Sequence, residues 1–304
     1  MSVIVLVHGI AQEQRSADSL EASWLPALVG GVRAAGSPHL ADELWRAARP
    51  GQIDTRMAFY GDLFLKDGAQ GAGDDEAADS DLAEELARAW LETAASRGSA
   101  KDRAVAAQVL AQLTGDQSRA QGAWAALRPA VNGLTRIPWF APMGIAAAGR
   151  FVKRALGQVT RYLTDDAIRA AAIGRVKTQI GPETRLVIGH SLGSVVGYET
   201  LFEVDQPLAL ITLGSPLGLR RVVYDRLRPQ PPRIPPPVQA WTNIADVDDL
   251  VASVLDLRRQ FPPGPGQAAI SYDSKRVDNG AAPHAAEHYL GKASVGAAVI
   301  QAIA

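Results

Sequence analysis

Cysteine is absent from this sequence of 304 residues. Disulfide bonds, thiolate metal sites and cysteine nucleophiles are therefore excluded from its chemistry. An excess of one charge is also absent, because 31 basic and 32 acidic residues leave a formal net charge of −1. Such a balance gives no strong field for gathering polyanions, and we expect no nucleic-acid partner.

Long hydrophobic runs are lacking as well. The first apolar run, at residues 3–7, has no cationic segment before it and no small-residue cleavage site after it, unlike a signal peptide. Elsewhere no uncharged apolar stretch reaches the roughly 20 residues that a membrane-spanning helix needs. These features predict a soluble, cytoplasmic protein.

Short apolar runs alternate along the chain with segments of helical spacing. Strands are predicted at residues 3–7, 55–60, 186–188, 208–213 and 238–244, with a weaker one at 270–272. Helical spacing is found over residues 19–35, 82–127, 166–180 and 293–304. The alternation predicts an α/β protein with a doubly wound, mostly parallel sheet, whose functional residues lie at the carboxyl ends of strands.

Residues 66–165 interrupt this alternation. A segment rich in Gly, Ala and Asp at 66–81 predicts a loop or disordered linker, and an unusually apolar segment surrounds Trp139 and Phe140. We therefore expect an α/β core formed by residues 1–65 and 166–304, with residues 66–165 inserted into it as a helical cap. Separately, the proline-rich residues 230–237 predict an extended surface linker.

One motif connects a predicted strand to a predicted helix. Gly189-His190-Ser191-Leu192-Gly193 matches the pattern G-x-S-x-G. A sharp turn from strand to helix leaves no room for side chains two residues to either side of the serine, which explains both glycines. The turn presents the Ser191 hydroxyl as a nucleophile, and the backbone N–H of Leu192 can donate to an oxyanion. We expect the same turn to direct His190 away from the nucleophile.

Three segments together resemble α/β-hydrolases of the lipase and esterase type. They are the turn at residues 189–193, the segment Val7-His8-Gly9-Ile10 after the first strand, and Leu213-Gly214-Ser215-Pro216-Leu217 after the fourth. The resemblance implies the α/β-hydrolase fold, with Ser191 as nucleophile. It further implies an oxyanion hole formed by the backbone N–H groups of Leu192 and of Gly9 or Ile10, and a triad in the chain order Ser, acid, His.

The sequence contains five histidines, and only His284 and His288 follow Ser191. His284 comes directly after a loop signal at residues 279–283, whereas His288 lies in a predicted helix start. We therefore favour His284 as the base and keep His288 as the alternative. The run His284-Ala285-Ala286-Glu287-His288 also fits the inverted zinc-protease pattern H-x-x-E-H, but no third ligand follows it, so we expect no metal.

Three aspartates follow the predicted strand at 238–244, namely Asp246, Asp248 and Asp249. The acid of a triad orients the histidine and stabilises its charged form. The segment Asp249-Leu250-Val251-Ala252 resembles the turn around the acid in lipase-like hydrolases, which favours Asp249. Asp246 lies nearest the strand end and stays as the alternative, and we expect the unused aspartate to cap a following helix.

These residues together predict a carboxylic-ester hydrolase that needs no cofactor and acts on a hydrophobic acyl or lipid ester. Thioesterase, acyltransferase and peptidase activities use the same triad, and an inactive binding module on this fold is a further alternative. The apolar segment around Trp139 and Phe140 is open to several interpretations: packing of the cap, a lid over Ser191, or contact with a membrane surface or a partner.

Overall fold

A computed structural model describes residues 2–46, 53–65, 80–115, 123–137, 139, 145–267 and 270–303. The chain divides into two compact units. Met1–Leu63 and Arg169–Ala304 form the first, which we call the sheet unit, and Phe64–Ile168 form the second, the helical unit. Residues 66–79, most of the expected linker, lie outside the described residues.

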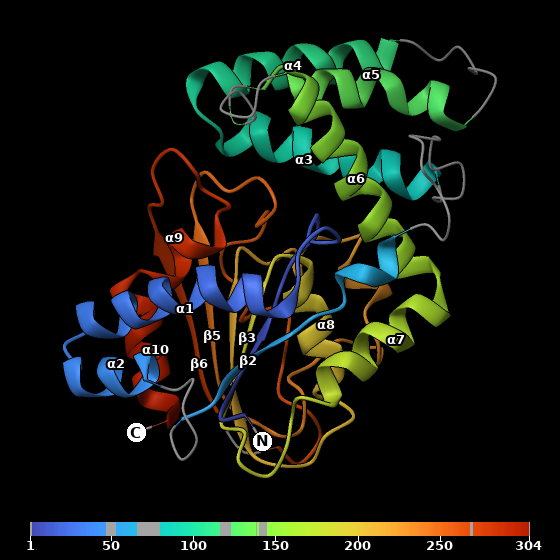
Figure 1. The fold of residues 1–304 in the computed structure, drawn as a ribbon. Coiled ribbons are helices and arrows are strands. Elements are labelled where there is room, and N and C mark those ends of the chain that lie inside the picture. Colours follow the sequence, from blue (N-terminus) through green and yellow to red (C-terminus); the bar gives the residue numbers. More distant parts are fainter. Residues whose placement is uncertain are drawn as a thin grey trace. The chain divides into compact units, whose positions relative to one another are not determined.

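The sheet unit is built on a six-stranded sheet whose strands all run parallel (Figure 1). The strand order is β2-β1-β3-β4-β5-β6. The strands are β1 Ile4–Val7, β2 Thr55–Ala58, β3 Leu186–His190, β4 Leu208–Leu213, β5 Val238–Asp246 and β6 Ser271–Val277. The expected α/β class and parallel sheet are thereby confirmed.

The strand order contains one change of direction that matters for function. Leu6 in β1 pairs with Met57 in β2 on one side and with Ile188 in β3 on the other. The chain therefore moves outward from β1 to β2 and then crosses to the opposite side of β1. In parallel α/β sheets, ligands bind outside the carboxyl ends of the strands at such a switch point. Here that point lies after Val7 and His190.

Helices cover both faces of the sheet, which explains why the central strands β1, β3 and β4 are buried at every position. Ile4, Leu6 and Ile188 join a core cluster with α1 (Ala17–Ala34) and α10 (Ala293–Ile303). Alternate residues point to the other face. There Gly197 of α8 (Leu192–Thr200) lies against Val7 and Val187. Figure 1 shows α8 on the other side of the sheet from α1 and α10.

Three further α-helices in the described part of the chain contribute to the sheet unit, and one of them carries an ion pair to the segment after β2. They are α2 (Pro38–Trp45), α9 (Ala286–Leu290) and α7 (Asp166–Lys177), of which residues 169–177 belong to this unit. Arg175 in α7 donates to both carboxylate oxygens of Asp62, at 3.1 and 3.0 Å. The ion pair therefore joins the segment where the chain leaves the sheet unit to the segment where it returns.

The helical unit contains α3 (Ser80–Arg97), α4 (Ala100–Gly115), α5 (Ala123–Thr135) and α6 (Ile145–Thr164). The continuous helical stretch expected over 82–127 was wrong, because the chain breaks at Gly98 and Ser99. The backbone N–H of Ser99 donates to Asp102 at 3.0 Å, and the N–H of Asp102 donates to the Ser99 hydroxyl at 3.2 Å. This reciprocal capping starts a new helix.

Two other expectations need correction. The segment 230–237 is not a surface linker throughout, since Ile234 is buried and donates its N–H to the carbonyl of Pro262 at 2.9 Å. The sixth strand extends to Val277, well beyond 272. Its polar sequence, Ser-Tyr-Asp-Ser-Lys-Arg-Val, hides it from a search for apolar runs, as is common for edge strands. In the described part of the chain, no helix is both long and apolar enough to cross a membrane.

Candidate active site

Ser191 lies on a strained turn between β3 and α8. Its backbone has φ 53° and ψ −129°, a conformation that residues with a side chain rarely adopt. The flanking glycines make the turn feasible. A Cβ on Gly193 would lie 2.3 Å from the carbonyl oxygens of Val7 and His8, so α8 can approach β1 only with glycine there.

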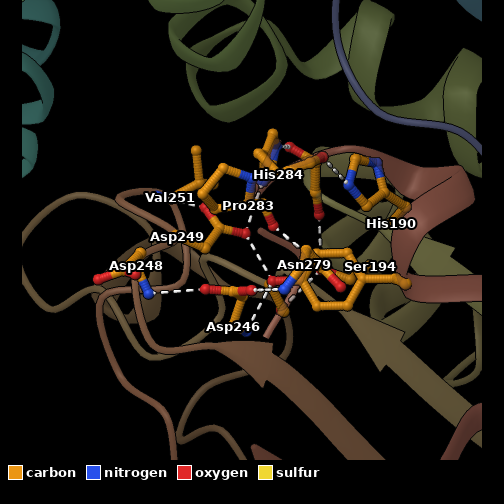
Figure 2. Close-up of polar contacts among 12 residues, drawn as sticks. His190, Ser194, Asp246, Asp248, Asp249, Val251, Asn279, Pro283 and His284 are labelled. Atoms are coloured by element: carbon orange, nitrogen blue, oxygen red, sulfur yellow. Dashed lines mark hydrogen bonds and ion pairs between the residues drawn. The ribbon is translucent and has the colours of Figure 1, made fainter. Parts of the chain in front are cut away.

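Ser191, His284 and Asp249 form a continuous chain of hydrogen bonds. The Ser191 Oγ lies 3.0 Å from His284 Nε2, and His284 Nδ1 lies 2.8 Å from Asp249 Oδ2. The Ser191 residue is 3% exposed, and the side chains of Asp249 and His284 are 0% and 11% exposed. Figure 2 shows the His284 ring directed at the Asp249 carboxylate. The favoured candidates from the sequence are thus brought together.

Asp249 is held by donors on both carboxylate oxygens. Its Oδ1 accepts the backbone N–H of Val251 at 2.9 Å. Its Oδ2 accepts from the Tyr289 hydroxyl at 2.8 Å and faces His284 Nδ1. Because an ionised carboxylate can only accept, Nδ1 carries the proton and Nε2 is left to accept from Ser191. This tautomer suits a general base.

Asp246, the alternative acid, has different neighbours. As the last residue of β5, it accepts the backbone N–H groups of Asp248, at 2.7 Å, and of Asn279. It does not cap a helix, because no helix follows β5 within the described residues up to 267. Burial raises the pKa of the Asp246 carboxyl, and the two backbone donors oppose that rise. Asp246 therefore anchors the loop that carries His284 and leaves Asp249 to contact the imidazole.

His288, the alternative base, contacts the backbone of Asn279. Its Nδ1 lies 2.9 Å from the carbonyl oxygen of Asn279, and the Asn279 amide donates to the carbonyl of Pro283 at 2.9 Å. Both contacts fix the loop before His284, in which Figure 2 labels Asn279 and Pro283. In the part of the chain that the structure describes, no group of three or more His, Asp or Glu side chains could hold a metal ion.

The turn directs the His190 side chain to His284, a contact that no pattern in the sequence predicted. The His190 Nε2 lies 2.9 Å from the carbonyl oxygen of His284, and the two rings are 4.6 Å apart between centroids (Figure 2). Burial lowers the pKa of His190 well below its usual value, and the neighbouring His284 lowers it further. His190 is therefore a neutral imidazole that donates to the His284 carbonyl. Only the fold brings this contact together, since the two residues are 94 positions apart.

The loop after β1 lies directly against the serine. A Cβ on Gly9 would lie 2.8 Å from the Ser191 Cβ. His8 supports this loop, because its Nε2 accepts the Tyr60 N–H at 3.1 Å and its carbonyl accepts the Tyr60 hydroxyl at 2.6 Å. Burial lowers the pKa of His8 to about 4, so the ring is neutral and can accept.

The proposed oxyanion donors occupy suitable backbone positions. Leu192 is the first residue of α8, where an N–H has no acceptor within the helix. Gly9 contacts Ser191 from the β1 side, and Ile10 follows it in the same loop with its carbonyl bonded to Gln12 at 3.1 Å. Their role in binding an oxyanion stays a prediction.

Several residues of the site were missed from the sequence. Tyr289 and Asn279 contact the two aspartates, and the Ser194 hydroxyl donates to the Ser191 carbonyl and lies 2.6 Å from the Ser215 hydroxyl. Tyr289 and Asn279 flank His284 in the sequence, but no local pattern marks them. Comparison of the chain with protein-family models, curated protein sequences and solved structures found no match.

Proposed function

We propose that this protein is a serine hydrolase of the α/β-hydrolase type that cleaves carboxylic esters. One observation carries the proposal: the hydrogen-bonded chain from Ser191 through His284 to Asp249, with the serine on a strained turn at the switch point of a parallel sheet. A nucleophile, a base and a group that orients the base are the parts needed for acyl transfer.

The reaction follows from these positions. The Ser191 Oγ attacks the acyl carbon while His284 Nε2 takes its proton, and the carbonyl oxygen becomes an oxyanion. The backbone N–H groups of Leu192 and of Gly9 or Ile10 stabilise that charge. The intermediate collapses to an acyl-serine as His284 returns the proton to the leaving alkoxide. Water, activated by His284, then releases the carboxylic acid and restores the serine.

We propose a hydrophobic acyl or lipid ester as substrate. The support is compositional: the G-H-S-L-G turn resembles that of lipases, and residues 137–145 of the helical unit are strongly apolar. In that segment the backbone N–H of Trp139 donates to Asp102 at 3.1 Å, and Phe140 lies outside the described residues. A role of this segment as a cap or as a membrane-surface contact belongs to the same proposal.

An active-site-directed fluorophosphonate probe tests the nucleophile. We expect covalent labelling of the wild-type protein and none of Ser191→Ala. Ser23→Ala is a matched control, because Ser23 lies on α1 and its hydroxyl donates to the carbonyl of Leu20 at 3.2 Å and accepts from Arg15 at 3.5 Å, neither of which belongs to the triad. Equal labelling of Ser191→Ala and wild type would refute the assignment.

A series of p-nitrophenyl esters tests the acyl preference. We expect kcat/KM to rise from acetate to esters with longer acyl chains, because a hydrophobic pocket gains binding energy from each buried methylene. A preference for acetate would contradict the hydrophobic substrate and leave the serine chemistry intact.

A further inference from the structure

Tyr289 connects the two aspartates that follow β5. It lies on α9 and is 0% exposed. Its hydroxyl oxygen is 2.8 Å from the backbone nitrogen of Asp246 and 2.8 Å from Asp249 Oδ2. The mechanism above does not use this phenol, although it touches the same carboxylate oxygen as His284.

The direction of the hydroxyl proton follows from these two partners. A backbone N–H can only donate, so the Tyr289 oxygen accepts from Asp246. Its single proton is then available for Asp249 Oδ2. Burial raises the pKa of the Tyr289 phenol well above its usual value, and the charge of Asp249 raises it further, so the proton stays on Tyr289.

We propose that Tyr289 is a positioning residue that sets the basicity of His284 by sharing the charge on Asp249 Oδ2. The inference rests on the proposed hydrolase function, in which His284 is the base. A carboxylate oxygen that accepts from a phenol has less negative charge to stabilise a neighbouring imidazolium. Tyr289 therefore weakens the stabilisation that Asp249 gives to a protonated His284.

Other titratable side chains face this cluster, and each of them is kept when Tyr289 is substituted. They come from the ends of β1, β3 and β5 and comprise His8, His190, Asp246, Asp248 and Asp249. His190 is buried and neutral, and it lies against the His284 ring. A change in the titration of His284 on altering Tyr289 alone therefore reports the phenol's own contribution.

Two opposite alterations of Tyr289 test the proposal. Tyr289→Phe removes the donor, and we expect the acid limb of the kcat/KM profile to move up by roughly half a pH unit. Site-specific 3-fluorotyrosine keeps the shape and makes the phenol a stronger donor, so the acid limb should move down. Tyr224→Phe is the control, because the Tyr224 hydroxyl donates to the carbonyl of Gln260, at 2.7 Å, and not to a triad residue. This variant should leave the acid limb of the kcat/KM profile unchanged.

Titration of the His284 ring by ¹⁵N NMR follows the same effect without turnover. If the wild-type protein fails to react with a fluorophosphonate, the hydrolase proposal fails while the NMR midpoints still report on Tyr289. Shifts in opposite directions for phenylalanine and fluorotyrosine support the proposal. The proposal would be overturned if the NMR midpoints stayed unchanged while the maximal kcat/KM fell, or if both alterations moved the midpoint in the same direction. If Tyr289→Phe does not fold, the fluorotyrosine shift alone decides.

Discussion

Replacing Asp249 with asparagine exchanges one carboxylate oxygen for an amide nitrogen and tests which of the two candidate acids serves His284. The amide has one oxygen, whereas Asp249 accepts from Val251 at Oδ1 and from Tyr289 and His284 at Oδ2. A hydroxyl can rotate and an imidazole can change tautomer, but the buried Val251 N–H cannot redirect its proton, so we expect the amide oxygen to take the place of Oδ1. The amide NH₂ group then takes the place of Oδ2 and presents a donor to His284 Nδ1. His284 must respond by accepting at Nδ1, which puts its proton on Nε2 and directs that proton at Ser191.

A histidine in this tautomer cannot take the serine proton. Loss of the correct tautomer and of the charge that stabilises imidazolium reduces kcat by about 10⁴-fold in triad enzymes. That factor corresponds to about 5 kcal/mol of transition-state stabilisation. The volume of the side chain hardly changes, so we expect the variant to stay folded.

The assay is hydrolysis of a p-nitrophenyl ester by wild type, Asp249→Asn and the matched variant Asp246→Asn. Asp246 accepts two backbone N–H groups, and an asparagine oxygen can replace only part of that acceptor set. Asp246→Asn should therefore cost about 1–3 kcal/mol of unfolding free energy and reduce activity far less than Asp249→Asn. A residual activity above one tenth in Asp249→Asn, or a larger loss in Asp246→Asn, would refute the assignment of the acid.

Two further predictions concern stability and are measured by urea unfolding. Gly193→Ala places a Cβ 2.3 Å from two carbonyl oxygens and should lower the unfolding free energy by more than about 2 kcal/mol. Gly30→Ala on α1 meets no atom within 4 Å and should raise the unfolding free energy by about 0.5–1 kcal/mol. Equal urea midpoints for the two variants would contradict the packing argument. Burial lowers the pKa of His8 to about 4, so the unfolded chain binds a proton more readily than the folded protein does. Neutral His8 therefore contributes its full share to the free energy of unfolding above pH 6.5, and this share is lost as the pH falls to 4. His8→Gln should remove up to roughly 3 kcal/mol of the difference in unfolding free energy between pH 7 and pH 4, and an unchanged difference would show that His8 does not titrate this way.

The sheet was predictable from the sequence where burial on both faces leaves a clear pattern. Residues 4–7 and 208–213 are buried at every position and, apart from Thr212, apolar, because helices cover them on each side. The edge strand β6 has no such pattern, and only pairing with β5 defines its length. The break between α3 and α4 does have a local cause, since Ser99 and Asp102 have capping-box spacing, but a long alanine-rich stretch conceals it.

The candidate site divides in the same way. Ser191 could be predicted because its motif encodes a local turn, and His284 could be predicted because only two histidines follow Ser191 in the sequence. Only a resemblance of the segment at 249–252 favoured Asp249 over Asp246, since the direction of a turn after a strand depends on the chain packed above it. The contacts of His190 and Tyr289 join segments that are far apart in the chain, so no local sequence pattern could predict them.

The ion pair between Asp62 and Arg175 has a consequence for how the protein can evolve. Because the chain leaves and re-enters the sheet unit at neighbouring points, the length of the intervening segment affects the sheet mainly through loop closure. Each doubling of a flexible loop costs only about 0.6 kcal/mol. We therefore expect changes of length in the loops of that segment to leave the strand register unchanged. The strand ends that present Ser191 and Asp249 should accordingly keep their positions when such loops are lengthened or shortened.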